Sequence, residues 1–542
     1  MNNVRLFDYK FLPLVFCLAL VGCSDNETSE VPNPENDEDI PEVSVDKIVS
    51  VDPTVKYQTI RGFGASDCWS PNYVGKYWTN HRDAITELLF SSEIVDGQPK
   101  GIGLSQWRVN LGAGSAEQGD ASGIEDESRR AESYMTENGT YDWNKCEGQR
   151  YFMNRAKEMG VPDFILFSNS PLVQYTKNGK GFSNSGMNTN LKDDCYDDYA
   201  KYMADVAKHY TDDGYNITHI SPVNEPQYNW DGGQEGSGWT NDQVARLARE
   251  LDANLTANGL SNIDILLGEA GDWEYLYKVK NEQERSDVIS AFFTPGSSAY
   301  VGDLQHVNNL ICGHSYWTDG TWDGMRQVRL NVHNKAIASG LELWQSEWSM
   351  LGDGYSSSEF VGYDAATEMD IALYMSRVIH NDLTVAQVSS WCYWTSIDVT
   401  RWAPHKNRFL LISLVPQGGA ETGDIKDEGS FNTAPTLWVL GNYSRFIRPG
   451  YVRVDLSMNE SMNFFGSAWI SPEGDKIVAV YTNYSDKAVK LIDGREGWDS
   501  QPTSVMIYTS SSSKHLKERI VPEDGDIYVD AKSVTTVVYE LK

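Results

Sequence analysis

Short apolar runs alternate with longer amphipathic stretches from residue 60 to residue 394. Short runs rich in apolar and β-branched residues predict buried strands, and stretches whose apolar residues recur at helical spacing predict the helices that cover them. The predicted strands are Ile60–Ser66, Leu104–Gly112, Asp163–Ser170, Ile217–Pro226, Asp264–Ala270, Ile311–Trp317, Leu341–Trp348 and Val388–Trp394. The chain therefore contains eight candidate β-α units.

The stretch from Thr240 to Gly259 is the clearest of the predicted helices. Thr240 and Gln243 have the spacing of a capping box, and Gly259 is typical of a helix end. Between them, one helical face carries Val244, Leu247, Ala248, Leu251 and Leu255. Tyr196–Tyr210 and Ala366–His380 show the same period, so helices are predicted there as well.

Eight successive β-α units favour an α/β fold, a (β/α)8 TIM barrel over residues 60–445. A doubly wound sheet is the alternative. The barrel is favoured because each predicted strand ends in polar or aromatic residues, and barrel enzymes hold their chemistry at the carboxyl ends of their strands. These strand-end residues include Asp67, Trp69, Asn110, Asn169, Glu225, Glu269, Tyr316, Glu347 and Trp394.

The pattern changes after residue 446. Short alternating runs follow one another between Gly, Pro, Asn and Ser residues, which predicts an antiparallel β-sandwich side domain over residues 446–542. Its predicted strands are Val452–Asp455, Ser467–Ile470, Ile477–Tyr481, Val505–Tyr508, Ile527–Val529 and Thr535–Tyr539. The strand-like stretch at residues 47–59 precedes the barrel, and we expect it to join this β domain.

The amino terminus is typical of a lipoprotein signal peptide over residues 1–22. Its apolar stretch, Phe11–Gly22, is too short to span a bilayer as a permanent helix. Residues 20–23 read Leu-Val-Gly-Cys and resemble a bacterial lipobox, in which Cys23 becomes the lipidated first residue. An ordinary signal peptide with a chance cysteine is the alternative. We therefore expect an extracytoplasmic protein, lipid-anchored to a bacterial outer membrane on its surface or its periplasmic face.

An acidic, flexible tether is predicted over residues 23–46. Residues 24–42 hold eight Asp and Glu, three Pro and neither Lys nor Arg. Like charges repel and prolines interrupt helices, so this segment is expected to be solvated. It would connect the lipid anchor to the folded body.

The charge balance of the chain excludes one class of partner. Its 77 Asp and Glu outnumber 45 Lys and Arg, for a formal charge of −32. Such a surface is poorly suited to neutralise nucleic-acid phosphates. The seven cysteines show no C-x-x-C spacing, which argues against a zinc site or a disulfide framework and leaves at most one disulfide open. No metal-binding motif or phosphate loop is visible, so we expect no metal and no cofactor, and a monomer.

Two glutamates stand at the ends of the fourth and seventh predicted strands. Glu225 lies between Asn224 and Pro226, and Glu347 precedes Trp348. These strands lie on opposite sides of a barrel mouth, so the two carboxyl groups can converge across it. Glycoside cleavage needs such a pair, one to protonate the leaving oxygen and one to attack or to activate water. For either residue alone, an ordinary ion pair with arginine is a competing interpretation.

Several segments resemble glycoside hydrolase family 30, a family of the clan A retaining β-glycosidases. They are residues 224–226, Gly62–Ser66, Trp107–Asn110 and Asn442–Gly450, together with the closing β domain. The resemblance covers residues 47–542. It implies that Glu225 is the acid/base, that Glu347 is the nucleophile, and that the anomeric configuration is retained, with carboxyl groups about 5–5.5 Å apart.

Two further segments are similar to the endo-β-1,6-galactanase branch of that family. They are residues 167–171, Phe-Ser-Asn-Ser-Pro, and residues 232–236, Gly-Gly-Gln-Glu-Gly. The chain departs from that branch at Asp67-Cys68-Trp69 and at residues 172–175. These departures concern the sugar and leave the catalytic pair unaffected.

Candidate sugar contacts follow from what a sugar presents, which is hydroxyl groups at its rim and apolar C–H groups on its faces. The 63 aromatic residues (17 Trp, 29 Tyr and 17 Phe) supply many rings for stacking. Trp69 and Trp394 are the candidate stacking rings, whereas Trp391 and Tyr393 are interpreted as core residues. The resemblance implies that Asn224 binds the sugar 2-hydroxyl and that Tyr316 lies near the nucleophile.

The remaining candidate substrate-binding residues each have a structural alternative. Arg108 could orient Glu347 and keep it ionised, or form a structural salt bridge. His314 is a satisfied strand-end histidine or a sugar ligand. Asn110 and Asn169 are further candidates, and Asp231 and Glu235 are sugar ligands or loop caps.

These features together predict a retaining glycoside hydrolase that cleaves a polysaccharide, with endo-β-1,6-galactanase as the favoured activity. A xylanase or a β-1,6-glucanase of the same family is the alternative. A non-catalytic glycan-binding surface lipoprotein is the alternative from another class, but a binding module has no need of two carboxylates. The expected partners are a polysaccharide or oligosaccharide and, through the lipid anchor alone, a membrane.

Overall fold

The computed structural model describes residues 44–541, apart from residues 185, 187, 352–358, 403–406, 496, 499, 523 and 524. The predicted signal peptide, the lipidation site at Cys23 and nearly all of the predicted tether lie outside the described residues. Among the described helices, none combines the length and the apolar character needed to cross a membrane. All five cysteines between Cys68 and Cys392 are free thiols.

Eight parallel strands form the central sheet, in the order β8-β7-β6-β5-β2-β11-β10-β9. A parallel bridge between Ala270 and Gly313 joins the two ends, so the sheet closes into a barrel. This confirms the predicted (β/α)8 fold over the doubly wound sheet. The strands are β2 (Gly62–Ser66), β5 (Gln106–Asn110), β6 (Asp163–Phe167), β7 (Ile217–Ser221), β8 (Asp264–Ile265), β9 (Leu310–His314), β10 (Glu342–Trp348) and β11 (Ser390–Tyr393).

Strand β8 is shorter than its apolar run predicts. Gly268 has a φ of +115°, which leaves strand geometry, and a Cβ there would lie 2.1 Å from the Cys312 carbonyl oxygen. Only glycine fits so close to a neighbouring backbone. The chain therefore turns at Gly268 and carries Glu269 toward the carboxyl face of the barrel.

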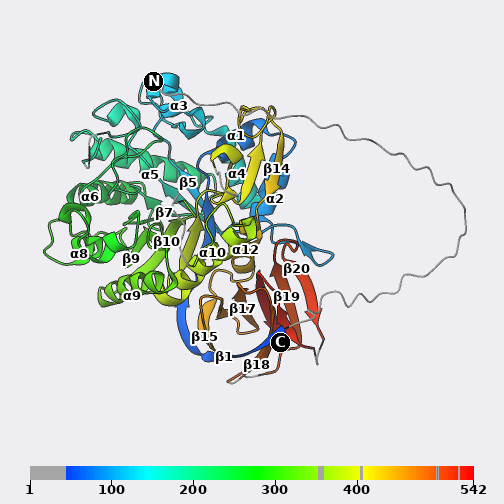
Figure 1. Cartoon of the computed structure of the whole chain (residues 1–542). Helices are drawn as coiled ribbons and strands as arrows, with labels where there is room; N and C mark the ends of the chain where they lie inside the picture. Colours follow the sequence, from blue (N-terminus) through cyan, green and yellow to red (C-terminus); the bar gives the residue numbers. More distant parts are fainter. Residues whose placement is uncertain are drawn as a thin grey trace, which may run out of the picture. The chain divides into compact units, whose positions relative to one another are not determined.

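Helices lie around the barrel strands (Figure 1). Helix α6 begins with the predicted capping box, in which Thr240 accepts from the Gln243 amide and the Gln243 side chain accepts from Thr240. The helices are α1 (Ser70–Tyr77), α2 (Arg82–Phe90), α3 (Ser115–Gln118), α4 (Glu147–Glu158), α5 (Tyr196–Asp212), α6 (Asn241–Ala257), α7 (Glu274–Tyr277), α8 (Val288–Phe293), α9 (Trp322–Ala338), α10 (Glu368–Asn381) and α12 (Pro435–Ser444).

A nine-stranded sheet follows the barrel, in the order β20-β19-β22-β17-β16-β15-β1-β18-β21. The amino-terminal strand β1 pairs antiparallel with β15 and parallel with β18, so the sheet is not wholly antiparallel. Its apolar side chains enclose a second core that includes Val49, Val454 and Val537. The strands are β1 (Ser44–Thr59), β15 (Val452–Met458), β16 (Phe464–Ile470), β17 (Lys476–Asn483), β18 (Ala488–Gly494), β19 (Ser504–Ser510), β20 (Lys517–Val521), β21 (Ile527–Val529) and β22 (Ser533–Glu540).

Helices α10 and α12 join the barrel to this sheet. Nearly every residue of α10 is buried, because the helix packs against α12 on one side and reaches strands β16, β17 and β22 on another. Polar contacts cross the same boundary: the Ser376 and Thr482 hydroxyls are 2.6 Å apart, and Asn442 donates to the Tyr508 carbonyl. The two parts therefore share buried structure and form one body.

Two small sheets lie in loops where the sequence predicted none. One consists of β12 (Ile397–Val399), β13 (Ile412–Val415) and β14 (Ser430–Thr433), and it follows barrel strand β11. The other is the hairpin of β3 (Ile94–Val95) and β4 (Gln98–Pro99). The first of them contacts α1, the helix after β2, and the Ser70 hydroxyl donates to Asp398 at 2.8 Å.

Candidate active site

Glu225 and Glu347 meet at the carboxyl face of the barrel. Glu347 belongs to β10, and Glu225 follows β7 in a turn where its own φ is +40°. The Glu225 amide donates to the Glu269 carbonyl at 2.9 Å, which holds this turn in place. One oxygen of each carboxyl group and one nitrogen of His314 all lie within 4.8 Å of one another. The positions of the two glutamates at the ends of the fourth and seventh predicted strands, β7 and β10, predicted this convergence.

Arg108 and Tyr316 hold the Glu347 carboxyl group from two sides. Arg108 Nη1 donates to Glu347 Oε2 at 2.7 Å, and the Tyr316 hydroxyl donates to Oε1 at 3.1 Å. The guanidinium carbon of Arg108 lies 3.9 Å from the centre of the Phe167 ring, which fixes its plane. Two donors on one carboxyl group favour its ionised form, which accepts at both oxygens.

A third carboxyl group, Glu269, lies directly behind the pair and is fully buried. It forms an ion pair with Arg108 Nη2 at 3.1 Å. Its Oε2 accepts from His314 Nε2 at 2.9 Å and from the Ser346 hydroxyl at 2.7 Å. Sequence reasoning placed Glu269 at a strand end but gave it no role, because nothing in its neighbours distinguishes it among 77 acidic residues.

His314 bridges Glu225 and Glu269. Its Nδ1 lies 3.0 Å from Glu225 Oε1 and its Nε2 lies 2.9 Å from Glu269 Oε2. Burial by itself would lower the pKa of His314, but Glu347, Glu225 and Glu269 outweigh it and raise the pKa to about 10. His314 is therefore an imidazolium that donates at both nitrogens, and an imidazolium has no lone pair to offer a metal ion.

The charges of this cluster nearly balance. Three carboxyl groups (Glu225, Glu269 and Glu347) face two cations (Arg108 and His314). Burial works to raise the pKa of Glu269, but Arg108, His314 and Ser346 hold it well below its usual range. Burial raises the pKa of Glu347; His314 and Arg108 oppose that rise, and Glu225 adds to it. With two cations and three carboxyl groups, the cluster is neutral when one carboxyl group is protonated.

The predicted aromatic and amide contacts fall into two groups. Trp69 and Trp394 meet edge to face, with ring centres 5.1 Å apart, and each keeps a small exposed area. Asn224 Oδ1 accepts from Arg108 Nη2 at 3.3 Å, which places that amide beside the catalytic pair. Both groups follow barrel strands at the carboxyl face that carries Glu225 and Glu347.

Asn110 and Asn169 form a pair of their own. Asn169 Nδ2 donates to Asn110 Oδ1 at 3.4 Å, and Asn169 Oδ1 is buried with no hydrogen-bond partner among the described residues. Asp67 accepts from the Asn110 amide and from Gln149 Nε2, and burial raises its pKa to about 7. Asp67 was recognised as a strand-end residue but given no role.

Some strand-end and loop residues serve the scaffold. Trp391 and Tyr393 are buried, as their alternation with Trp394 indicated. Glu235 is also buried, and its carboxyl group accepts from the amides of Ala113 and Ser115 and from the Ser115 hydroxyl. Glu235 therefore caps the loop after β5.

The chain was compared with known proteins. The model of O-glycosyl hydrolase family 30 matches residues 46–404, more than half of the chain. An endo-beta-1,6-galactanase from Hypocrea rufa is 25% identical over 426 residues, which are 75% of this chain and 75% of that protein. The glucuronoxylanase XynC from Bacillus subtilis (strain 168) is 26% identical over 353 residues, 64% of this chain and 67% of that protein.

Solved structures share the whole architecture. A conserved exported protein from Bacteroides fragilis is 29% identical with a TM-score of 0.83, and the match covers 91% of this chain and 100% of that one. An endo-beta1,6-glucanase is 16% identical with a TM-score of 0.62, over 91% of this chain and 94% of that one. At that identity, the second match shows the fold alone.

Proposed function

The chain belongs to glycoside hydrolase family 30 and is an O-glycosyl hydrolase that acts on polysaccharide; from that premise we propose that it is a retaining endo-β-1,6-galactanase. The observation that carries the retaining mechanism is the convergence of Glu225 and Glu347, with oxygens within 4.8 Å of each other. A retaining enzyme needs its carboxyl groups close together, whereas an inverting enzyme leaves room between them for water.

Glu347 is the nucleophile in the first half of the proposed reaction. Its carboxylate attacks the anomeric carbon while Glu225 donates a proton to the leaving glycosidic oxygen. The bond between the anomeric carbon and the leaving oxygen breaks, and an ester between Glu347 and the sugar forms. The two donors on Glu347 support this assignment, because Arg108 Nη1 at 2.7 Å and the Tyr316 hydroxyl at 3.1 Å both favour its carboxylate form.

Glu225 changes role in the second half. As a carboxylate it takes a proton from water, whose oxygen attacks the anomeric carbon. The ester bond breaks, Glu347 leaves as a carboxylate, and Glu225 holds the proton again. Two displacements at one carbon retain its configuration.

The neighbouring residues have supporting roles in this proposal. Arg108 and Tyr316 orient Glu347, and Asn224 binds the sugar 2-hydroxyl beside it. Both ring nitrogens of His314 are occupied by carboxyl groups, so we assign His314 to positioning Glu225 in place of a sugar contact. The remaining sugar contacts are the rings of Trp69 and Trp394 and the amides of Asn110 and Asn169.

The galactan preference is supported by the similarity to the Hypocrea rufa enzyme across three quarters of both chains. The glucuronoxylanase is similar over a smaller share of this chain. The test is hydrolysis of β-1,6-galactan, glucuronoxylan and β-1,6-glucan by purified chain, with product configuration followed by NMR. Release of oligosaccharides from galactan with retained configuration is expected, and activity on xylan alone would overturn the substrate.

A Glu225→Gln variant tests the acid/base role against substrates that differ in leaving group. A polysaccharide needs its leaving oxygen protonated, so we expect a loss of about 10²–10⁴-fold there. A dinitrophenyl glycoside needs no protonation, so its first step should slow far less and glycosyl-enzyme should accumulate. Equal losses on both substrates would contradict the assignment.

The place of action in this proposal is outside the cytoplasm, with Cys23 as the lipid attachment point. The support is the lipobox-like segment at residues 20–23 and the similarity to a protein described as exported. In bacteria that express the chain, palmitate labelling should require Cys23 and disappear in Cys23→Ser. Cys195→Ser, which removes a cysteine from the folded body, should keep the label; labelling of Cys23→Ser would refute the anchor.

A further inference from the structure

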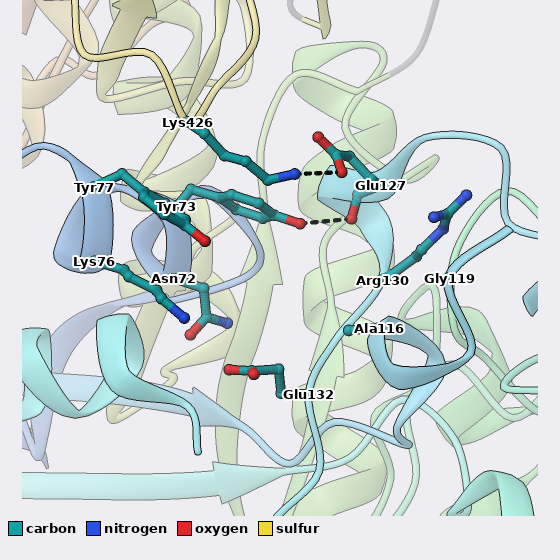
Figure 2. A pocket seen from close by; sticks show the side chains of 10 residues that line it. All are labelled: Asn72, Tyr73, Lys76, Tyr77, Ala116, Gly119, Glu127, Arg130, Glu132 and Lys426. Atoms are coloured by element: carbon teal, nitrogen blue, oxygen red, sulfur yellow. Dashed lines mark hydrogen bonds and ion pairs between the residues drawn. The ribbon is translucent and has the colours of Figure 1, made fainter. Parts of the chain in front are cut away.

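A cavity of about 300 Å³ lies in loops that the catalytic proposal does not use (Figure 2). Its size is at the lower end of the range of small-ligand sites, about 300–1,000 Å³. The residues that line it include Asn72, Tyr73, Lys76, Tyr77, Glu132 and Lys426.

Three loops from neighbouring barrel strands enclose this cavity. Helix α1 follows β2, Glu132 lies in the loop after β5, and Lys426 lies between β13 and β14, after β11. Strands β11, β2 and β5 are adjacent in the barrel order. All three loops leave the carboxyl ends of their strands, so the cavity shares the face of the barrel that carries Glu225 and Glu347.

The Trp69 ring connects the cavity wall to the aromatic pair at the active site. Trp69 is the residue before α1, and its ring also meets Trp394. The Arg129 guanidinium lies 4.1 Å from the centre of the Trp69 ring, and Arg129 is held by an ion pair with Asp398 at 2.7 Å. The next residue along the chain, Arg130, lines the cavity. Trp69 and Arg129 therefore link the chain segments that line the cavity to the aromatic pair beside Glu225 and Glu347.

The cavity combines an aromatic wall with mixed polar groups. The rings of Tyr73 and Tyr77 are stacked, with centres 6.4 Å apart at 27°, and Tyr77 is 38% exposed. Figure 2 shows the Tyr77 hydroxyl, the Lys76 amine and the Asn72 amide directed to the same space. The Glu132 carboxyl group lies on the opposite wall (Figure 2).

The charges of the lining favour an uncharged ligand. Lys426 pairs with Glu127 at 2.6 Å, and Lys76 lies 3.8 Å from Glu147. Cations and carboxylates both line the space, and this suits hydroxyl groups that both donate and accept. A ring for stacking beside such groups is what a neutral sugar unit requires.

We propose that this cavity is an accessory subsite that binds a neutral glycosyl unit of the polysaccharide, either a side branch or a unit distant from the cleaved bond. The proposal rests on the proposed function, since it assigns a second contact to the same substrate. Tyr77 provides the stacking ring, and Lys76, Asn72 and Glu132 bind hydroxyl groups.

The test compares a long substrate with a short one. In Tyr77→Ala, the ratio of kcat/KM on β-1,6-galactan to kcat/KM on β-1,6-galactotriose should fall about tenfold, the loss expected for one stacking contact. Tyr57→Ala is the matched control, because Tyr57 on β1 is also 38% exposed. That control should keep the wild-type ratio. A Tyr77→Ala ratio within twofold of wild type would overturn the subsite.

Binding without turnover separates this proposal from the catalytic one. The Glu347→Gln variant should be retarded in a native gel that contains soluble galactan. Adding Tyr77→Ala to this variant should lower the apparent affinity for galactan, derived from the retardation, about tenfold. Equal retardation of both variants would refute the subsite and leave the enzyme assignment intact. If the wild-type chain cleaves xylan instead, the same ratio is measured with xylan and xylotriose. If it cleaves no polysaccharide, the proposed function fails while the gel still reports on the cavity.

Discussion

Two buried ion networks in the barrel differ in their charge balance. In one, Arg329 of α9 pairs with Asp382 at 2.9 Å, and Asp382 also accepts from the Ser315 hydroxyl and the Trp391 indole. One cation faces one anion there, and both side chains are fully buried. In the other, the active-site cluster, Arg108 and His314 face three carboxyl groups.

The third carboxyl group distinguishes the active-site cluster from the Arg329–Asp382 pair, which has a structural role. A balanced buried pair has one favoured protonation state, because moving its proton would leave an uncompensated charge. The active-site cluster is neutral only when one of its carboxyl groups is protonated, and in the proposed mechanism Glu225 gives a proton to the leaving group and recovers it from water. The comparison predicts that changes to the first network alter stability and changes to the second alter rate.

Removal of the proposed nucleophile should have the largest effect. In Glu347→Ala, we expect kcat on polysaccharide to fall by at least about 10⁴-fold, because the covalent route is lost. Azide, which can take the place of the carboxylate, should restore turnover of an activated aryl glycoside and give an azide product of inverted configuration. Steady-state kinetics and NMR of the product would measure both. Wild-type activity in this variant would contradict the assignment of Glu347 as the nucleophile.

Disruption of the balanced pair should instead cost stability. In Asp382→Asn, the uncompensated Arg329 should lower the free energy of unfolding by about 3–5 kcal/mol. Denaturant unfolding would measure the loss, and active-site titration would give kcat per folded molecule, which should stay within about threefold of wild type. A large fall in kcat at unchanged stability would show that this network also belongs to the catalytic machinery.

Neutralisation of Glu269 should change the pH dependence of activity. His314 has an ordinary pKa of 6.5 and a pKa of about 10 in the fold. Its stabilising contribution is therefore full below about pH 6.5 and is lost as the pH rises through about 10. Glu269→Gln removes one carboxylate that raises this pKa, so the alkaline fall in both stability and kcat/KM should move to lower pH.

The control for Glu269→Gln is Asp382→Asn, which changes a carboxyl group outside the active-site cluster. The fall of its kcat/KM at high pH should coincide with that of wild type once its lower stability is taken into account. Direct titration of the His314 ring by NMR would assign the group. An unchanged His314 pKa in Glu269→Gln would contradict the bridging role.

Loss of the tyrosine hydroxyl should have the smallest effect. Tyr316→Phe removes one hydrogen bond to the Glu347 carboxylate, worth about 1.5–3 kcal/mol, so kcat should fall about 10- to 100-fold. Arg108 still holds the other oxygen of Glu347. Kinetics on an aryl glycoside would measure the change, and a loss as large as that of Glu347→Ala would mean that Tyr316 acts directly on the substrate.

The fold could be predicted from the sequence because its signals are local. Period-two and helical patterns located all eight barrel strands and the capping box of α6. Strands β18 and β20 were missed, and so was the small sheet of β12, β13 and β14. Those strands are partly exposed or inserted in a loop, so their apolar pattern is weak and their pairing comes from partners distant in the chain.

The candidate site could be predicted only in part. Strand-end position and the resemblance to family 30 identified Glu225 and Glu347, and the tyrosine and arginine beside them. Glu269 was missed as a functional residue because its significance lies in contacts with Arg108, His314 and Ser346, which come from three other strands. His314 was left between two interpretations for the same reason.

The sequence by itself determined the class of fold, the family, and the two carboxyl groups at opposite strand ends, because periodicity and motifs are written in neighbouring residues. Only the tertiary structure decided which charged groups form ion pairs with one another. Ion pairing and burial depend on distance in space, and Arg108, Glu225, Glu269, His314 and Glu347 lie far apart along the chain. Closure of the barrel joins these five side chains into one network of ion pairs and hydrogen bonds.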